Sequence, residues 1–145
     1  MGIKTFLSKE QQEAIVQAIV DAENATSGEI RVHMESSCKI DVLDRATQIF
    51  KKLRMHKTEL RNGALIYLAV KDRKFAILGD AGINAKVPDG FWDEIKAVMA
   101  SNFKKDDFVT GLTVGIHMIG EKLKTYFPLM DDDENELSNE ISFGA

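Results

Sequence analysis

RNGALIYLAVKDRKFAILGDAG, residues 61–82, is the stretch that decides the fold, and it predicts a β-hairpin. Two uncharged apolar runs, residues 64–70 and 75–78, flank four charged residues that suit a short turn. Strands without polar alternation need cover on both faces, so we expect both in the centre of a sheet between helices. Because such a hairpin begins and ends at one edge of the sheet, Asn62 and Asp80 should be neighbours.

The sequence before the hairpin predicts a helix, a strand and a second helix. Ser8 and Gln11 have the spacing of a capping box, which predicts a helix over residues 9–23. Residues 29–35, EIRVHME, alternate apolar and polar and predict a strand with one wetter face, near the edge of the sheet. An amphipathic helix beginning at Asp41 separates this strand from the hairpin, which predicts a right-handed crossover between parallel strands. Glu29 should therefore lie at the edge that holds Asn62 and Asp80.

The C-terminal half predicts two more helices. Pro88 suits the first turn of one of them, and a break near residues 102–105 separates it from another that continues to about Tyr126. Two glycines four residues apart in the last helix, Gly111 and Gly115, would allow a close approach to a neighbour or let the helix bend. The expected fold is α/β, a three-layer α/β/α sandwich with a small mixed β-sheet.

The domain organisation is one unit, residues 1–128, followed by an acidic C-terminal tail, residues 129–145. Residues 131–145 carry six acidic residues and no Lys or Arg, although the net charge of the whole chain is only −4. Three apolar side chains in this tail could still dock on the body: Leu137, Ile141 and Phe143.

Composition limits the classes of function. The 145 residues are 44% hydrophobic and 29% charged, as is ordinary for a soluble globular domain. No segment approaches the roughly 18 apolar residues that span a membrane, and no basic stripe with interleaved aromatic residues favours nucleic-acid binding. A single cysteine, Cys38, excludes an internal disulfide, and the N-terminus lacks a signal-peptide pattern. We expect a cytoplasmic monomer with a protein partner, no nucleic acid and no membrane span.

Three stretches resemble the TPM domain family, named for its thylakoid-lumen, photosystem II-associated and worm receptor-associated members. They are SGEIRVHMES at residues 27–36, the hairpin with its flanks at 61–83, and FKKDDFVTGLTVGI at 103–116. The resemblance covers about residues 8–126. It implies an α/β/α fold, a divalent-ion site, often for calcium, among acidic residues at one edge, and the phosphatase activity described for some members.

Two departures from the family pattern limit what the resemblance implies. The family's Gly-Tyr-Gly-Leu-Glu after the third strand is replaced here by GDAGI, residues 79–83, so any ion site needs other ligands. The signal peptide and C-terminal membrane helix of many members have no counterpart, so a membrane-tethered role does not carry over.

Hard oxygen ligands are predicted to converge on the edge where the strands begin and end. Such ligands, without cysteine or clustered histidine, suit Ca²⁺ or Mg²⁺ rather than Zn²⁺. Each residue also has a structural interpretation, as a strand start, a turn residue or a partner of a helix dipole. The predicted metal ligands are Glu29, Asn62, Asp80, Asp89 and Asp93.

A basic run, residues 51–61, is predicted to end the second helix near the same edge. Arg54, Lys57 and Arg61 could bind a phosphate or another anion beside the metal, or could simply stabilise the helix C-terminus. The sequence favours a calcium-binding, non-catalytic interaction or regulatory module. The alternative is a metal-dependent hydrolase similar to an acid phosphatase. No catalytic residue is assigned, because Cys38 and the three scattered histidines match no catalytic motif.

Overall fold

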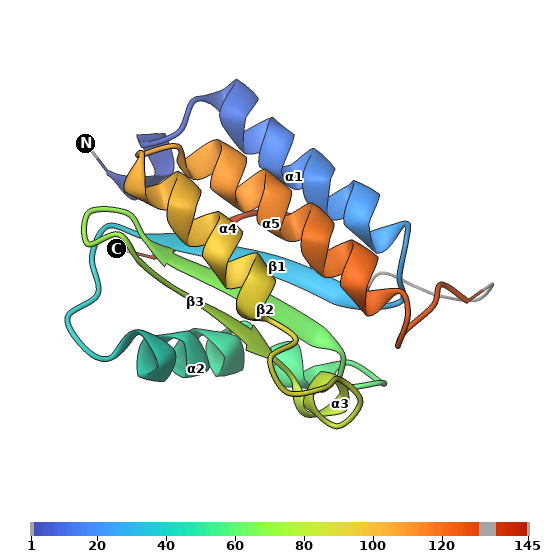
Figure 1. Ribbon diagram of the computed structural model, residues 1–145. Coiled ribbons are helices and arrows are strands. Elements are labelled where there is room, and N and C mark those ends of the chain that lie inside the picture. Colours follow the sequence, from blue (N-terminus) through green and yellow to red (C-terminus); the bar gives the residue numbers. More distant parts are fainter. Residues whose placement is uncertain (1, 131–135, 145) are drawn as a thin grey trace.

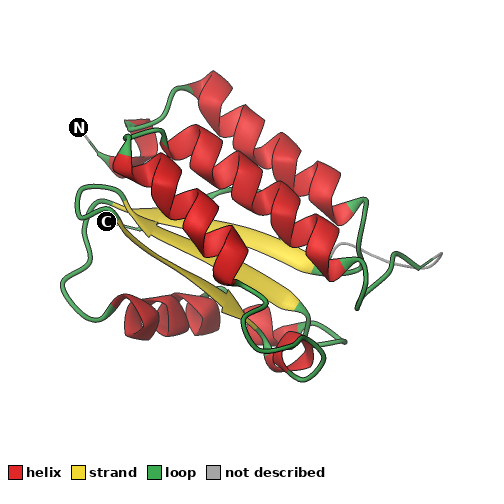
Figure 2. Cartoon of the chain, viewed as in Figure 1, coloured by secondary structure: helices red, strands yellow, loops and turns green. Residues whose placement is uncertain are grey.

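The computed structural model describes residues 2–130 and 136–144. Figure 1 shows its arrangement and Figure 2 its secondary structure. The strands are β1 (Glu29–Glu35), β2 (Gly63–Ala69), β3 (Lys74–Gly79) and β4 (Ser142–Phe143). The helices are α1 (Lys9–Glu23), α2 (Val42–Lys52), α3 (Ala81–Asn84), α4 (Asp93–Lys104) and α5 (Phe108–Leu123), with short 3₁₀ turns η1 (Ile3–Thr5) and η2 (Met55–Lys57).

The sheet has the strand order β3-β2-β1-β4. β1 and β2 are parallel, and β2 and β3 form the antiparallel hairpin, as predicted. Helices α1, α4 and α5 cover one face of the sheet and α2 covers the other (Figure 1). The α/β class and the mixed sheet are therefore confirmed.

The expectation that both hairpin strands lie centrally was wrong, because β3 is at the edge of the sheet. Ala76 and Ile77 in β3 are each only 4% exposed. Helices above and below the sheet bury such side chains whether or not another strand lies alongside. An uncharged run thus indicates cover on both faces, and it gives no information about position within the sheet.

Local signals fixed the first two helices. The Ser8 hydroxyl accepts a hydrogen bond from Gln11 N at 3.1 Å, and the Gln11 side chain accepts one from Ser8 N at 2.9 Å. Asp41 caps α2 by accepting from the backbone of its first turn. Both helices begin where the capping residues predict.

The chain after the hairpin differs from the prediction. The Asp80 carboxylate accepts a hydrogen bond from Ala81 N at 2.7 Å, so the chain enters the short helix α3 directly after β3. Pro88 lies in the loop that follows, and α4 starts only at Asp93. The predicted third helix is therefore α4, which starts at Asp93 rather than at Pro88, and the short helix α3 forms where a turn was predicted.

The glycines of α5 allow close packing against α4. A Cβ at Gly111 would lie 2.5 Å from the Phe103 ring, and one at Gly115 would lie 2.5 Å from the Met99 sulfur. Side chains at these positions would collide with Phe103 and Met99 of α4, which are buried in the core. The close-approach interpretation is confirmed.

The C-terminal segment docks on the body, as expected. Ser142 and Phe143 pair in parallel with β1, and Gly144 N donates to the Met34 carbonyl at 2.9 Å. Ile141 and Phe143 pack against the larger core, and Leu137 packs on the α2 side. The preceding acidic stretch, residues 131–135, lies outside the described residues. In the described part of the chain no helix has the length and apolar character needed to cross a bilayer.

Candidate functional site

Three strand ends meet at one edge of the sheet. In the register of the sheet, Glu29 lies opposite Gly63, and Asp80 N donates to the Gly63 carbonyl at 2.9 Å. Glu29 N donates to the Asn62 carbonyl at 3.2 Å. Glu29, Asn62 and Asp80 are 4%, 2% and 6% exposed. The strand topology therefore brings these three residues to one edge, and their side chains are buried there.

The Glu29 carboxyl faces a second carboxyl, that of Glu23 at the end of α1, and is hydrogen-bonded to it. Burial raises the pKa of both carboxyl groups, and that of Glu23 rises to about 8. The neighbouring charge of Glu29 adds to the rise at Glu23. Glu23 also accepts a hydrogen bond from Ile30 N at 2.9 Å, and Glu29 accepts one from Glu136 N in the tail.

The carboxyl pair has no cationic partner among the described residues, where neither Glu23 nor Glu29 forms an ion pair with Lys or Arg. Glu29 is buried and Glu23 half-buried, and two carboxyl groups in contact away from bulk water favour sharing a proton or binding a cation. Sequence reasoning missed Glu23 because it ends a helix whose apolar stripe explains the helix alone. The signal was the short turn to Glu29, which reverses the chain and brings the two residues together.

Asp80 has a different environment. Its carboxylate forms a bidentate ion pair with Arg61, with Nε–Oδ2 and Nη2–Oδ1 distances of 2.8 Å. One of the same oxygens accepts the Ala81 N–H that caps α3. The charge of Asp80 is thus already balanced by a guanidinium.

Asn62 and two threonines hold the loops of the edge in place. The Asn62 side-chain amide donates to the Ser27 carbonyl at 3.2 Å, and its backbone N–H donates to the Thr58 hydroxyl at 3.3 Å. The Thr26 hydroxyl donates to the Phe127 carbonyl and accepts from Gly28 N.

The other predicted ligands stand apart from this cluster. Asp89 is exposed in the loop before α4, and Asp93 is exposed at the first residue of that helix. Within residues 2–130 and 136–144, no group of three or more His, Cys, Asp or Glu side chains is placed to hold a metal ion. The structure therefore gathers Glu29, Asn62 and Asp80 at the edge, adds Glu23, and does not bring Asp89 and Asp93 into one cluster with them.

The predicted anion-binding residues divide in the same way. Arg61 lines a hollow of about 450 Å³ between α2 and β3, together with Lys51 and His56. Arg54 and Lys57 are exposed around η2 and do not line it. One cation of the predicted set, Arg61, thus contacts the acidic edge directly through Asp80.

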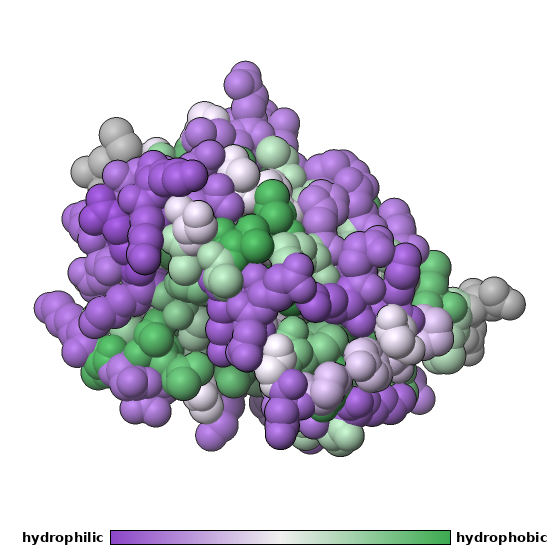
Figure 3. All heavy atoms as spheres, viewed as in Figure 1, coloured by the Kyte–Doolittle hydropathy of each residue, from purple (hydrophilic) through white to green (hydrophobic). Residues whose placement is uncertain are grey.

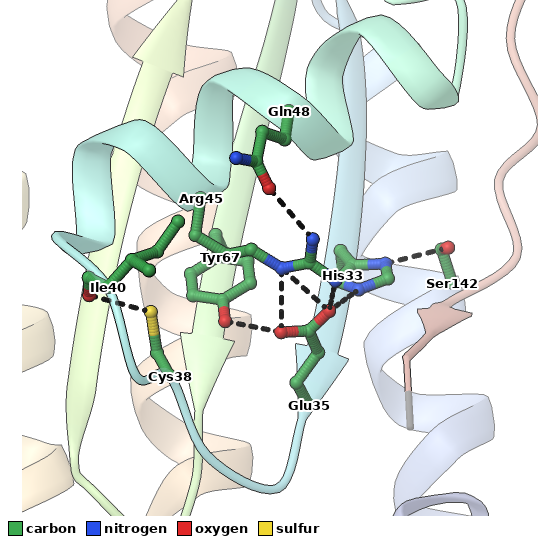
Figure 4. Close-up of polar contacts among 8 residues, drawn as sticks. All are labelled: His33, Glu35, Cys38, Ile40, Arg45, Gln48, Tyr67 and Ser142. Atoms are coloured by element: carbon green, nitrogen blue, oxygen red, sulfur yellow. Dashed lines mark hydrogen bonds and ion pairs between the residues drawn. The ribbon is translucent and has the colours of Figure 1, made fainter.

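A second buried polar cluster, at the other end of β1, was not predicted (Figure 4). Glu35 accepts hydrogen bonds from Tyr67 Oη at 2.6 Å and from Arg45 Nε at 3.1 Å, and is paired with His33 Nε2 at 3.1 Å. The other ring nitrogen of His33 is 2.8 Å from the Ser142 hydroxyl of the tail. We had interpreted His33 and Glu35 as the wetter face of a strand, and α2 and the tail cover that face.

The charges in this cluster are matched. Burial alone would raise the pKa of Glu35, but hydrogen bonds from Arg45, Tyr67 and His33 outweigh it and lower the pKa to about 2. Burial lowers the pKa of His33 despite the neighbouring carboxylate, so the neutral ring is favoured. The buried Cys38 thiol donates to the Ile40 carbonyl at 3.2 Å nearby.

Fold and site together define an α/β/α sandwich domain with a carboxyl-rich edge. The chain belongs to the TPM domain family, because the family's sequence model matches residues 4–122. A comparison with curated proteins gives no match.

Solved structures show the same fold. The NMR structure of BA42 protein from the psychrophilic bacterium Bizionia argentinensis is 51% identical, with a TM-score of 0.92 and 98% of each chain covered. The N-terminal domain of cg2496 protein from Corynebacterium glutamicum is 15% identical, with a TM-score of 0.67 over 99% of this chain and 84% of that one. The N-terminal domain of a protein from P. gingivalis is 19% identical, with a TM-score of 0.70 over 87% and 82%. The last two likenesses concern the fold alone.

Proposed function

We propose that this TPM domain binds one divalent cation, Ca²⁺ or Mg²⁺, at the edge of the sheet and acts as a non-catalytic interaction or regulatory module. The observation that carries the proposal is the pair of carboxyl groups formed by half-buried Glu23 and buried Glu29, which lacks a cationic partner among the described residues. A divalent cation there would replace a shared proton and balance both charges.

The donor set fits a hard cation. The carboxylates of Glu23 and Glu29 and the side-chain oxygen of Asn62 are oxygen ligands of the kind that Ca²⁺ and Mg²⁺ prefer, and water can supply the remaining positions. Of the five predicted ligands, the proposal keeps Glu29 and Asn62 at its centre. Asp80 has a supporting role, since its pairing with Arg61 fixes the loop beside the site.

The side chains at this edge favour binding over catalysis. The hydroxyl groups of Thr26 and Thr58 are hydrogen-bonded to backbone groups of neighbouring loops. Neither is paired with a histidine or a carboxylate in the described part of the chain, so neither has the base that would activate it as a nucleophile.

A metal-dependent hydrolase similar to an acid phosphatase is the second candidate, and the position of Arg61 beside the edge favours it. Arg61 lines the hollow beside the edge and could hold a phosphate group there, with Lys51 close by. To do so Arg61 must release part of its bidentate contact with Asp80. Arg54 and Lys57 would serve only as exposed cations that attract the anion.

The test is a Ca²⁺ titration of the metal-free protein followed by amide NMR, with Mg²⁺ for comparison. Saturable shifts are expected at Glu23, residues 27–30 and Asn62. Glu29→Gln should weaken binding by at least about tenfold, since it removes one of two charged ligands. Glu13→Gln, at an exposed position of α1, is the matched control.

Unchanged Ca²⁺ affinity in Glu29→Gln would refute the site. Hydrolysis of p-nitrophenyl phosphate that depends on Ca²⁺ and is lost in Arg61→Gln would favour the hydrolase over the non-catalytic module.

A further inference from the structure

The two lateral edges of the sheet, which run parallel to the strands and are distinct from the end where Glu29 lies, are covered differently. The outer edge of β1 carries β4, a segment of the same chain. The outer edge of β3 has no strand partner among the described residues. β3 contains no proline, and its only charged residue is Lys74 at its start. Edge strands without such protection readily pair with an extended chain.

One end of the β3 edge is already closed. The Asn84 side-chain amide donates to the Gly79 carbonyl at 2.9 Å, and α3 follows immediately. An added strand would therefore pair with the part of β3 between Lys74 and Leu78. This length is enough for a short peptide of about five residues.

A groove runs beside this edge, between β3 and α2. It is the hollow of about 450 Å³ described above, and Phe50 and Leu78 form its apolar part. Leu43 and Thr47 precede Phe50 on the same face of α2, because residues four and seven apart share a face. Figure 3 shows apolar surface in the region of α2. Leu43 in this helix and Ile40 just before it are 53% and 45% exposed.

The end of the groove is cationic. The segment that closes it, residues 51–61, carries five Lys or Arg and a single acid, Glu59. Lys51, His56 and Arg61 line the hollow, and so does Asp80, which is paired with Arg61. Lys51 is therefore the lining Lys or Arg without an ion pair among the described residues. Nδ1 of His56 is buried and has no hydrogen-bond partner among the described residues. This combination complements a carboxylate in the groove.

We propose that an extended acidic peptide of a partner protein binds here as an additional strand along β3. In the bound peptide, one apolar side chain packs against Phe50 and Leu78. Alternate residues of a strand point to the same side, so the peptide side chain two residues away lies near the cationic end of the groove. That second side chain carries a carboxylate, which lies near Lys51 and His56. The inference rests on the proposed function only in treating the domain as an interaction module, and it does not need the cation site.

The probe is the synthetic peptide Ac-Ser-Thr-Leu-Thr-Glu-Thr-Ser-NH₂, in which Leu and Glu share one face of a strand. An NMR titration should give saturable amide shifts in β3 and along residues 47–51. Replacing Glu by Lys in the peptide should weaken binding by about tenfold, and added salt should weaken it too.

Thr47→Arg is the matching protein variant. Thr47 is exposed and lines the groove together with Phe50 and Leu78, so an arginine there occupies the space for the peptide's leucine and places a charge beside the apolar part of the groove. Binding of the peptide should fall by at least about tenfold, which is about 1.4 kcal/mol. Ala97→Arg, at an exposed position of α4 on the other face of the sheet, is the control and should leave binding unchanged. Should Thr47→Arg fold poorly, Lys51→Glu tests the charge term instead.

Absence of saturable shifts in β3, or equal binding by Thr47→Arg and Ala97→Arg, would overturn the proposal. So would inorganic phosphate shifting the same residues while the peptide does not, because the hollow would then be a site for a small anion. Ca²⁺ titration of Thr47→Arg separates this proposal from the proposed function. Retained Ca²⁺ affinity with lost peptide binding supports the groove, and peptide binding without Ca²⁺ binding refutes the cation site alone.

Discussion

Replacing Glu35 by glutamine should make the protein less stable at neutral pH and equally stable in acid. Glu35 is 4% exposed, and its carboxylate takes part in contacts with Arg45, Tyr67 and His33. Glutamine is nearly the same size, so the substitution removes the charge with little change in packing. The variant thus isolates the electrostatic part of the cluster in Figure 4.

The magnitude follows from the difference in pKa. The carboxyl has a pKa of about 2 in the folded protein and an ordinary value of 4.5. As the pH falls, the unfolded chain takes up the proton first, so the stabilisation is complete above about pH 4.5 and is lost as the pH approaches 2. A difference of about 2.5 units corresponds to about 3 kcal/mol at pH 7.

Urea denaturation followed by far-UV circular dichroism measures the effect. Glu35→Gln should lower the free energy of unfolding by about 3 kcal/mol at pH 7, and the gap to the parent should close progressively below pH 4.5. Glu13→Gln, exposed on α1, should differ little from the parent at either pH. Burial lowers the pKa of His33 and the Glu35 carboxylate raises it, so the acid destabilisation from His33, which begins below 6.5, is larger in Glu35→Gln until Glu35 of the parent is itself protonated.

A gap that stays constant between pH 7 and pH 3.5 would refute the reasoning, because the loss would then come from packing rather than from the charge. A gap below about 1 kcal/mol at pH 7 would show that the cluster contributes no more than an ordinary hydrogen bond.

Three further predictions concern other parts of the fold. In EDTA, the parent should lose stability as the pH rises from about 4.5 to about 8, because a pKa of about 8 means that Glu23 keeps in the folded state a proton that the unfolded chain releases. Glu23→Gln should remove this loss. Denaturation of both proteins at pH 6 and 9 measures the difference, and parallel profiles would contradict the prediction. Gly111→Ala should destabilise the protein by about 1–3 kcal/mol, although alanine favours helices, because its Cβ would meet the rigid Phe103 ring; thermal unfolding decides, and a raised melting temperature would contradict the packing. Ser142→Ala removes the contact with His33 at 2.8 Å and should speed amide exchange of Gly144 about fivefold, while an unchanged rate would show that the strand pairing alone holds the tail.

Sequence reasoning predicted what depends on neighbours along the chain. The start of α1 follows from a capping box that involves only Ser8 and Gln11. The parallel pairing of β1 and β2 follows from the helix between them, and this pairing brings Glu29 beside Asn62. Each of these inferences uses one local pattern and one rule of connection.

The remaining features depend on contacts between distant segments. The position of β3 at the edge, the cover that the tail gives to His33, and the pairing of Asp80 with Arg61 are consequences of tertiary packing. Apolar periodicity carries no information about which polar side chains meet across such contacts. For that reason Glu23 was missed and Asp80 was interpreted as a free ligand.

The two carboxyl groups of β1 show why burial alone does not identify a functional residue. Glu29 and Glu35 lie on the same face of one strand and are each 4% exposed. The pKa of Glu35 is lowered because Arg45, Tyr67 and His33 donate to it or pair with it. The pKa of Glu29 is raised because burial, together with the charge of Glu136, outweighs the hydrogen bonds that Glu29 receives from Glu23 and the tail backbone. With its charge balanced by its partners, Glu35 needs no ligand and holds α2 and the tail on the sheet. Glu29 lacks a protein cation in the described chain, and for this reason the proposed cation site lies at its end of β1 rather than at the end that holds Glu35.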